Sequence, residues 1–209
     1  MALREEKVLL LIADISGYTD FMLANEKSLE HSHIIISELI ETILSEVQLP
    51  LTLAKLEGDA VFLYAVKDES FAERAEDLGS RVLRFFHVFA NKVAELTLSS
   101  FCKCGACTNI ERLKLKVVVH SGRCAFYQIA NLTELSGVDV IIVHRLLKNS
   151  VGLNEYVLLT EAAQRLRDTR LGPLVDDVGG AQLLAGVHAH VEGGVVGIGE
   201  APLPGIDLH

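Results

Sequence analysis

The chain has 209 residues, of which half are hydrophobic and 22% are charged, and this size and composition fit one globular domain with a substantial core. The formal net charge of −9 argues against polymeric nucleic acid or an anionic membrane surface as the main partner, because both reward clustered lysine and arginine. No run approaches the roughly 20 apolar residues that span a bilayer, and the N-terminus lacks a signal-peptide layout. We therefore expect a cytoplasmic protein with reduced cysteines and no membrane partner.

Hydrophobic periodicity predicts alternating strands and helices along the first two thirds of the chain. In chain order these are strand Val8–Ile12, helix Ser28–Val47, strands Leu51–Leu56 and Ala60–Val66, helix Phe71–Leu96 and strand Leu113–Val119. The two strands on either side of Gly58-Asp59 are expected to form a tight hairpin.

The last third is predicted as helix Val138–Leu147, strand Tyr156–Leu159 and helix Glu161–Arg167. Thr160 would cap the second of these helices. The tail from Leu171 is rich in Gly and Val and is expected to form late strands and turns. The order β-α-β-β-α-β is that of a ferredoxin-like α+β sandwich. We expect a single domain over residues 1–209, with its core at about 7–167 and a C-terminal extension at about 168–209.

Two carboxylates stand at predicted strand ends. Asp14 follows the apolar run and precedes a Gly17 turn and a helix start, and Asp59 lies at the tip of the hairpin. Carboxylates on neighbouring strand ends can share Mg²⁺, which prefers oxygen ligands and usually works with substrate phosphates. The pattern predicts a metal-dependent phosphoryl-transfer site. The alternative is a pair of turn carboxylates, with Asp14 capping the next helix.

Four blocks resemble, in order and spacing, the catalytic homology domain of class III adenylate and guanylate cyclases. They are Ala13-Asp14-Ile15-Ser16-Gly17-Tyr18-Thr19, Lys55-x-x-Gly58-Asp59-Ala60, Val119-His120-Ser121-Gly122 and the stretch from Glu134 to Leu146. The resemblance covers roughly residues 7 to 167. It is strongest to a divergent bacterial branch of uncertain function.

The resemblance implies a role for each matching residue. Asp14 and Asp59 would bind two Mg²⁺ or Mn²⁺ ions, and the backbone carbonyl of Ile15 would complete part of the metal shell. Lys55 would read the adenine ring of a nucleoside triphosphate with Glu134 as its partner, because a lysine donates hydrogen bonds and a carboxylate accepts them from an exocyclic amine.

Two further cations match positions of the family. Arg145 falls on the transition-state arginine, whose fork suits a phosphate, and Lys116 occupies a position often held by a phosphate-contacting arginine. The resemblance also implies a homodimer, in which the carboxylates of one subunit face Arg145 and Lys55 of the other. The plain alternatives are a surface Lys55 beside a loop Glu134, and a solvated basic face that holds Arg145 and Lys148.

Two departures from the family leave two functions open. Ile141 stands where the family has a catalytic Asn, and no Lys occurs after Lys148 to match a late phosphate-contacting lysine. Losing one positioned polar group can cost about 10²–10³ in rate. The chain is either a nucleotidyl cyclase that converts ATP to cyclic AMP and pyrophosphate with weak or absent activity, or a catalytically inactive nucleotide-binding or protein-interaction module.

Three cysteines, Cys102, Cys104 and Cys107, fall within six residues. Such spacing suits a thiolate zinc site in a reducing compartment, although structural zinc normally has four ligands. Cys124 is a poor fourth candidate because it lies beyond the strand Leu113–Val119, so a fourth ligand would come from another loop or chain. The alternative is reduced thiols or an oxidised pair.

The histidines give weaker signals. His120, near a strand end, is more often packed or hydrogen-bonded than a ligand or base. His188 and His190 alternate as on a strand face and are not expected to form a metal pair.

Overall fold

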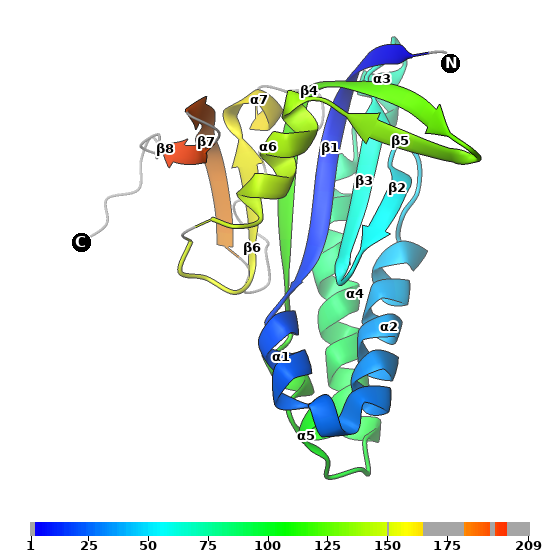
Figure 1. Cartoon of the computed structure of the whole chain (residues 1–209), viewed down its shortest axis with the longest axis vertical. Coiled ribbons are helices and arrows are strands. Elements are labelled where there is room, and N and C mark those ends of the chain that lie inside the picture. Colours follow the sequence, from blue (N-terminus) through cyan, green and yellow to red (C-terminus); the bar gives the residue numbers. More distant parts are fainter. Residues whose placement is uncertain (1–2, 150, 165–181, 193–194, 200–209) are drawn as a thin grey trace.

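A sheet of eight strands forms the centre of the molecule in the computed structural model, which describes residues 3–149, 151–164, 182–192 and 195–199. The strand order is β2-β3-β1-β4-β6-β7-β8, with β5 paired to β4 (Figure 1). The strands are β1 Arg4–Ser16, β2 Thr52–Glu57, β3 Ala60–Val66, β4 Lys114–Ile129, β5 Leu132–Ser136, β6 Tyr156–Thr160, β7 Gln182–Glu192 and β8 Val195–Gly199.

Helices lie on both faces of the sheet and extend beyond one end of it. They are α1 Tyr18–Ala24, α2 Leu29–Ser45, α3 Phe71–Arg74, α4 Leu78–Ser99, α5 Gly105–Thr108, α6 Val138–Leu146 and α7 Glu161–Gln164, together with the 3₁₀ turns η1 Glu26–Ser28 and η2 Ile110–Arg112. No helix among the described residues is long and apolar enough to cross a membrane.

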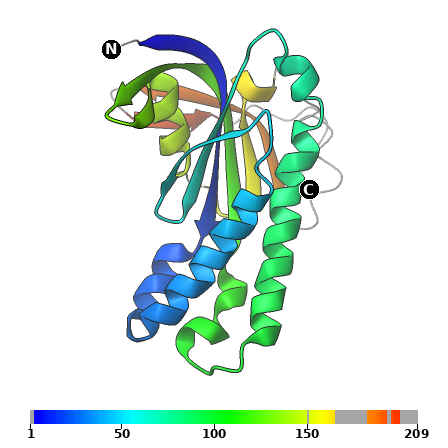
Figure 2. The ribbon, with the colours of Figure 1, turned by 90° about the vertical axis from the view of Figure 1, so that its right-hand side faces the viewer.

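Strand β1 is the centre of the core because its apolar run is buried on both faces. It pairs antiparallel with β3 on one side and with β4 on the other. Leu9 and Leu11 pack in the core beneath α2 and α4, whereas Leu10 and Ile12 pack in a second core beneath α6. The two long helices therefore cover one face and α6 covers the opposite face (Figure 2).

The predicted ferredoxin-like α+β sandwich is confirmed. The β1, α2, β2, β3, α4, β4 succession gives the order β2-β3-β1-β4, which is that of a split βαβ arrangement. Strands β6 and β7 then extend the sheet in parallel pairing. The predicted late strands are present as β7 and β8, and the remainder of the predicted tail lies outside the described residues.

Several predicted boundaries were wrong. The helix predicted over Phe71–Leu96 is two helices, because the chain turns at Ala75 and restarts at Leu78. The strand predicted over Leu113–Val119 continues to Ile129, since β1 pairs with it as far as Arg4 opposite Phe126. Strand β5 and the short helix α5 were not predicted, and of the helix expected over Glu161–Arg167 the part from 165 to 167 lies outside the described residues.

A helical tip projects beyond the lower end of the sheet in Figure 1. We use this name for residues 18–35 and 96–112, which hold α1, η1, the start of α2, the end of α4, α5 and η2. Short α5 contacts α1, α2 and α4. The tip therefore joins segments that are far apart in the sequence.

Candidate functional site

The carboxylates of Asp14 and Asp59 meet on the face of the sheet that α6 covers. Asp14 lies on that face because it alternates with Leu10 and Ile12 along β1. It stands opposite Ala60 of β3, next to the β2–β3 turn, where Gly58 takes a φ of 68°. That turn places the carboxyl group of Asp59 near Asp14, and both residues line the same cavity.

The surroundings of Asp59 change its proton affinity. Burial, followed by the charge of Asp14, raises the pKa of Asp59 from 3.8 to about 7. The pair therefore resists carrying two negative charges unless a cation lies beside it. Two carboxylates in this arrangement form an oxygen-rich donor set suited to a hard divalent cation.

Lys116 provides one cation to this pair. Its Nζ lies 2.8 Å from Oδ2 of Asp14 and donates to the carbonyl of Leu147 at 3.4 Å. Lys116 is the direct β4 partner of Asp14 across the sheet. The position that resembles a phosphate-contacting arginine is therefore beside the carboxylates.

A cavity of about 320 Å³ opens over these groups. Its walls are the β1–α1 turn from residue 14 to 20, Asp59, Lys116 and the end of α6 at Leu147 and Lys148. The Ile15 side chain is buried among core residues on the α2–α4 face, so Ile15 presents its backbone to this carboxylate cavity. The sequence did not predict that Lys148 lies at this cavity, because no local signal shows how the chain turns after α6.

Lys55 and Glu134, which the resemblance pairs, are close in the structure. The Nζ of Lys55 lies 3.6 Å from Oε2 of Glu134 and 3.1 Å from Oε1 of Glu57. The other Glu57 oxygen, Oε2, lies 2.8 Å from Nε2 of His144 on α6. We call these four residues the Lys55 cluster. Glu57 was missed, although its position two residues after Lys55 on the same strand face was a usable signal.

Arg145 and Ile141 lie one turn apart on the exposed side of α6. The Arg145 side chain is exposed, and none of the ion pairs within the described residues involves it. Ile141 is 50% exposed and Val138, one turn earlier, is 64% exposed. Among the described residues, no ion pair therefore joins Arg145 to Asp14 or Asp59 of its own chain.

His120 is a packed histidine, as the sequence favoured. Its Nδ1 lies 3.0 Å from Oγ1 of Thr160 and its Nε2 lies 2.9 Å from Oδ1 of Asp139. The Thr160 hydroxyl also accepts a hydrogen bond from the Ala163 amide at 3.3 Å, which is the predicted cap of α7. His120 thus connects β4 with β6 and α6.

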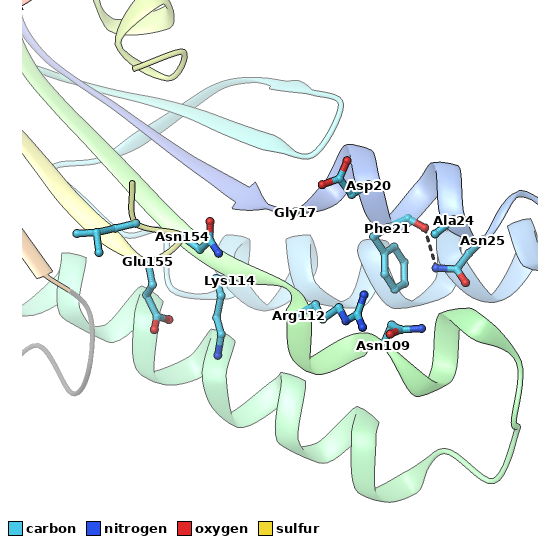
Figure 3. A pocket seen from close by; sticks show the side chains of 11 residues that line it. Gly17, Asp20, Phe21, Ala24, Asn25, Asn109, Arg112, Lys114, Asn154 and Glu155 are labelled. Carbon is cyan, nitrogen blue, oxygen red and sulfur yellow. Dashed lines mark hydrogen bonds between the residues drawn. The ribbon is translucent and has the colours of Figure 1, made fainter. Parts of the chain in front are cut away.

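A second cavity, of about 740 Å³, lies between α1, η2 and the loop that precedes β6. Figure 3 shows Arg112, Lys114, Asp20 and Glu155 around it. It shares Asp20 and Gly17 with the carboxylate cavity. Two cationic and two anionic side chains therefore lie next to the candidate metal site.

The three clustered cysteines gather around a histidine from α2. Nδ1 of His31 lies 3.4 Å from the sulfur of Cys104 and 3.5 Å from that of Cys107. The ligand atoms of these residues and Cys102 all lie within 4.8 Å of one another. Cys124 is buried in the core beneath α6 and is not part of this group.

His31 precedes Cys104 by 73 residues, and no local sequence signal connects the two. His188 and His190 lie on β7 opposite Gly199 and Gly197, but their side chains are outside the described residues.

Solved structures show that this is the class III cyclase fold. The guanylyl cyclase Cya2 matches with a TM-score of 0.59 and 12% identity, over 95% of this chain and 91% of that one. The adenylyl cyclase CyaB from P. aeruginosa matches with a TM-score of 0.56 and 16% identity, over 79% and 82%. A class III adenylyl cyclase-like ATP-binding protein from Pseudomonas aeruginosa has a TM-score of 0.59 and 16% identity, over 78% of this chain and 35% of that one.

Sequence comparison finds a curated relative and a family. The uncharacterized protein Rv2561/Rv2562 of Mycobacterium tuberculosis (strain ATCC 25618 / H37Rv) is 31% identical over 136 residues, which are 64% of this chain and 60% of that protein. This chain thus spans less than two thirds of its relative's length. Residues 36–156 match the family described as "Protein of unknown function (DUF2652)", and because this range is more than half of the chain, the chain belongs to that family.

Proposed function

We propose that the protein is a nucleotidyl cyclase-like homodimer. It binds a nucleoside triphosphate with Mg²⁺ or Mn²⁺ and converts ATP to cyclic AMP and pyrophosphate at a rate far below that of an intact cyclase site. The observation that carries the proposal is that Asp14 and Asp59 line one cavity, close enough for the charge of Asp14 to act on Asp59, within a class III cyclase fold.

Chemistry of the donor set supports a hard divalent cation. Asp14, Asp59 and the Ile15 backbone offer only oxygen ligands, which Mg²⁺ and Mn²⁺ prefer, and Mg²⁺ commonly completes its shell with water and substrate phosphates. When bound, the ions lower the pKa of the ribose 3′-hydroxyl and offset phosphate charge. Because the pair holds a proton up to about pH 7, a cation there also removes an electrostatic penalty that the protein otherwise carries.

Lysines around the carboxylate cavity are suited to bind the phosphates. Lys116 is held by Asp14, and Lys148 reaches the same cavity from the end of α6. Arg112 and Lys114 line the cavity next to it. We propose that Lys148 contacts the terminal phosphates and so replaces the late lysine that the chain lacks.

The Lys55 cluster is proposed to read the base. Lys55 donates and Glu134 accepts, and adenine presents one ring acceptor and one exocyclic amine donor on its Watson–Crick edge. Glu57 holds Lys55 from the same strand, and His144 holds Glu57 from α6. These contacts restrict the rotamers of Lys55, so less entropy is lost when the base binds.

The exposed side of α6 is proposed to face a second copy of the chain. Val138, Ile141 and Arg145 follow one another along it at spacings of three and four residues, and both apolar side chains are largely exposed. In a two-fold dimer each Arg145 would approach the carboxylates of its partner, which gives two equivalent sites. Static light scattering at micromolar concentration tests this, and a purely monomeric protein would contradict a site shared between subunits.

A low rate follows from Ile141. An alkyl side chain cannot hydrogen-bond the ribose, and loss of one positioned group costs about 10²–10³ in rate. The same residue favours the second candidate function, an inactive regulatory module that binds a nucleotide. The structural neighbour described as a class III adenylyl cyclase-like ATP-binding protein has the same fold.

One experiment separates these outcomes. Purified protein is titrated with ATP and GTP by calorimetry in Mg²⁺ or Mn²⁺, and cyclic nucleotide is measured in the same samples. We expect saturable binding that Asp14→Ala abolishes and that Glu41→Gln, an exposed carboxylate change on α2, leaves intact. Binding with slow product supports the cyclase, binding without product supports the inactive module, and unchanged affinity in Asp14→Ala rules out the proposed metal anchor.

A further inference from the structure

We propose that Cys102, Cys104, Cys107 and His31 bind one structural Zn²⁺ ion that holds the helical tip together. The site takes Cys102 and Cys104 from the α4–α5 loop, Cys107 from α5 and His31 from α2, and none of these residues lines the carboxylate cavity. It does not depend on nucleotide binding, so either proposal can fail without the other.

The distances within the cluster fit a tetrahedron. Zinc holds sulfur at about 2.3 Å and nitrogen at about 2.0–2.1 Å, so a tetrahedral angle separates a sulfur from a nitrogen by about 3.5 Å. Nδ1 of His31 lies 3.4 Å and 3.5 Å from the sulfurs of Cys104 and Cys107. All four ligand atoms lie within 4.8 Å of one another. The tetrahedral edges are about 3.8 Å between two sulfurs and about 3.5 Å between sulfur and nitrogen, so no ligand pair has to close by more than about 1.3 Å.

The ligand types select zinc over the cation proposed for the carboxylates. Three thiolates and one imidazole form a closed set of the kind found in structural zinc sites. Soft sulfur ligands disfavour Mg²⁺, which requires oxygen. The backbone amide of Cys104 donates to the sulfur of Cys102 at 3.4 Å, a hydrogen bond of the kind that orients metal ligands.

The surroundings of the cluster are apolar on one side. A hollow of about 250 Å³ beside His31, Cys102 and Cys107 is lined by hydrophobic side chains, among them Ile35 and Ile110, which are buried. An apolar shell of this kind limits the access of water and competing ligands to a metal site.

The α4–α5 loop and the start of α5 have little local structure of their own, so a metal link would stabilise them. Helix α5 has only four residues and no side-chain cap at its N-terminus, which is far below the length at which a helix is stable alone. The loop before it leaves Phe101 97% exposed and so buries little apolar surface there. A metal that joins α2 to this loop closes a chain segment of more than 70 residues, which restricts the unfolded chain.

Holding α5 in place also shapes the cavity between α1 and η2. Gly105 at the start of α5 approaches Asn25 so closely that a Cβ there would lie 2.3 Å from the Asn25 Oδ1 atom. Asn25, whose amide donates to the Phe21 carbonyl at 2.7 Å, lines the cavity in Figure 3. The zinc site therefore supports one wall of the cavity that adjoins the carboxylates.

The test measures metal in the 209-residue chain purified under reducing conditions without chelator. We expect elemental analysis to find about one zinc ion per chain. Replacing zinc by Co²⁺ should give the sulfur-to-metal charge-transfer and strong ligand-field bands of a tetrahedral thiolate site. His31→Ala and Cys107→Ser should each weaken Zn²⁺ binding by at least about 10-fold, whereas His33→Ala, an exposed histidine two residues along α2, should bind like the wild type.

Each alternative gives a different result. Protein that lacks zinc, fails to take up Co²⁺ and keeps all its thiols free in a thiol count would overturn the proposal, and so would a Cys104–Cys107 disulfide in the reduced preparation. Equal zinc affinity in wild type and His31→Ala would remove His31 from the site. If the variants fail to fold, the wild-type protein still tests the proposal. Its melting temperature should fall when a chelator removes zinc and return when zinc is restored. An unchanged melting temperature would count against a structural ion.

Discussion

Lys116 and Asp14 face each other across the β1–β4 pair, with Nζ 2.8 Å from Oδ2 and with side chains only 19% and 15% exposed. A mostly buried lysine thus offsets the charge of one proposed metal ligand. An ion that binds Asp14 must share it with this ammonium, or Lys116 must turn toward another acceptor such as a phosphate oxygen. Metal binding and triphosphate binding are therefore expected to be coupled through Lys116.

Lys116→Met should separate the two effects. The variant keeps an apolar stem of similar length but removes the charge, so Mn²⁺ alone should bind more tightly, while MnATP should bind more weakly because a phosphate contact is lost. A hydrogen bond to a charged group contributes about 1.5–3 kcal/mol, which corresponds to a change of roughly 10-fold or more in each affinity. Calorimetry with Mn²⁺ and with MnATP measures both. Lys27→Met, an exposed change on η1, is the control, and a parallel loss of both affinities would indicate that Lys116 has only a packing role.

Asp59→Asn should change how stability depends on pH. In the folded protein the pKa of Asp59 is raised from 3.8 to about 7, so between about pH 4 and pH 7 the folded state binds more protons than the unfolded state. The free energy of unfolding of the wild type must then fall as pH rises through this window, by at most about 1.4 kcal/mol per pH unit, and by less because the cavity admits water.

The asparagine variant lacks this titration. Without Mg²⁺ or Mn²⁺, its stability relative to the wild type should rise from pH 4 to pH 7 and stay constant above. Calorimetric melting over this range measures the difference, with Glu41→Gln as a matched surface change. Identical pH slopes for wild type and Asp59→Asn would show that Asp59 does not hold the proton.

The parts of the fold that were predicted correctly are those with a strong local pattern. The apolar run of β1, the hairpin at Gly58-Asp59 and the order of the elements determine a ferredoxin-like arrangement. The errors occurred where tertiary contacts override periodicity. Strand β4 continues past Gly122 because β1 pairs with it there, and the turn at Ala75 interrupts a helical spacing that runs on without a break in the sequence.

The same division applies to the candidate site. Asp14, Asp59, Lys55 and Glu134 belong to motifs with a resemblance to known domains, and the structure brings each pair together. Lys148 and His31 could not be found in this way. Their places depend on how α6 ends and on how α2 packs against the α4–α5 loop, and both are long-range outcomes of folding.

Lys55→Ala tests base recognition separately from phosphate binding. The Lys55 cluster lies partly exposed between β2, β5 and α6, so its ion pairs contribute little to stability and the variant should fold normally. ATP affinity in Mn²⁺ should fall by roughly 10-fold, the value of one good hydrogen bond to a charged donor, whereas the affinity for inorganic tripolyphosphate should not change. Lys27→Ala, the same change at an exposed lysine on η1, serves as the control. Equal losses for ATP and tripolyphosphate would place Lys55 near the phosphates instead of the base.

Ile141→Asn asks whether one residue accounts for slow turnover. Ile141 is 50% exposed on α6, so an asparagine there leaves no cavity in the core and should cost little stability. The resemblance to cyclases implies that a carboxamide at this position orients the ribose. In a fully preorganised site, one such positioned donor lowers the activation free energy by roughly 2.7–4 kcal/mol. Because Lys148 would have to serve in place of the late lysine, we expect a smaller effect, with cyclic AMP formation rising at least several-fold.

The readout is the cyclic AMP formed per chain at saturating MnATP. Val138→Asn is the matched control, because it also replaces an exposed aliphatic side chain by asparagine, one turn earlier on the same side of α6. An increase in Ile141→Asn alone would mean that the carboxylates, Lys116 and Arg145 still form a competent site that lacks one donor. If Ile141→Asn folds and binds ATP as the wild type does but yields no more product, the defect lies elsewhere in the site. The chain would then be better described as a nucleotide-binding module that retains the metal carboxylates without the chemistry.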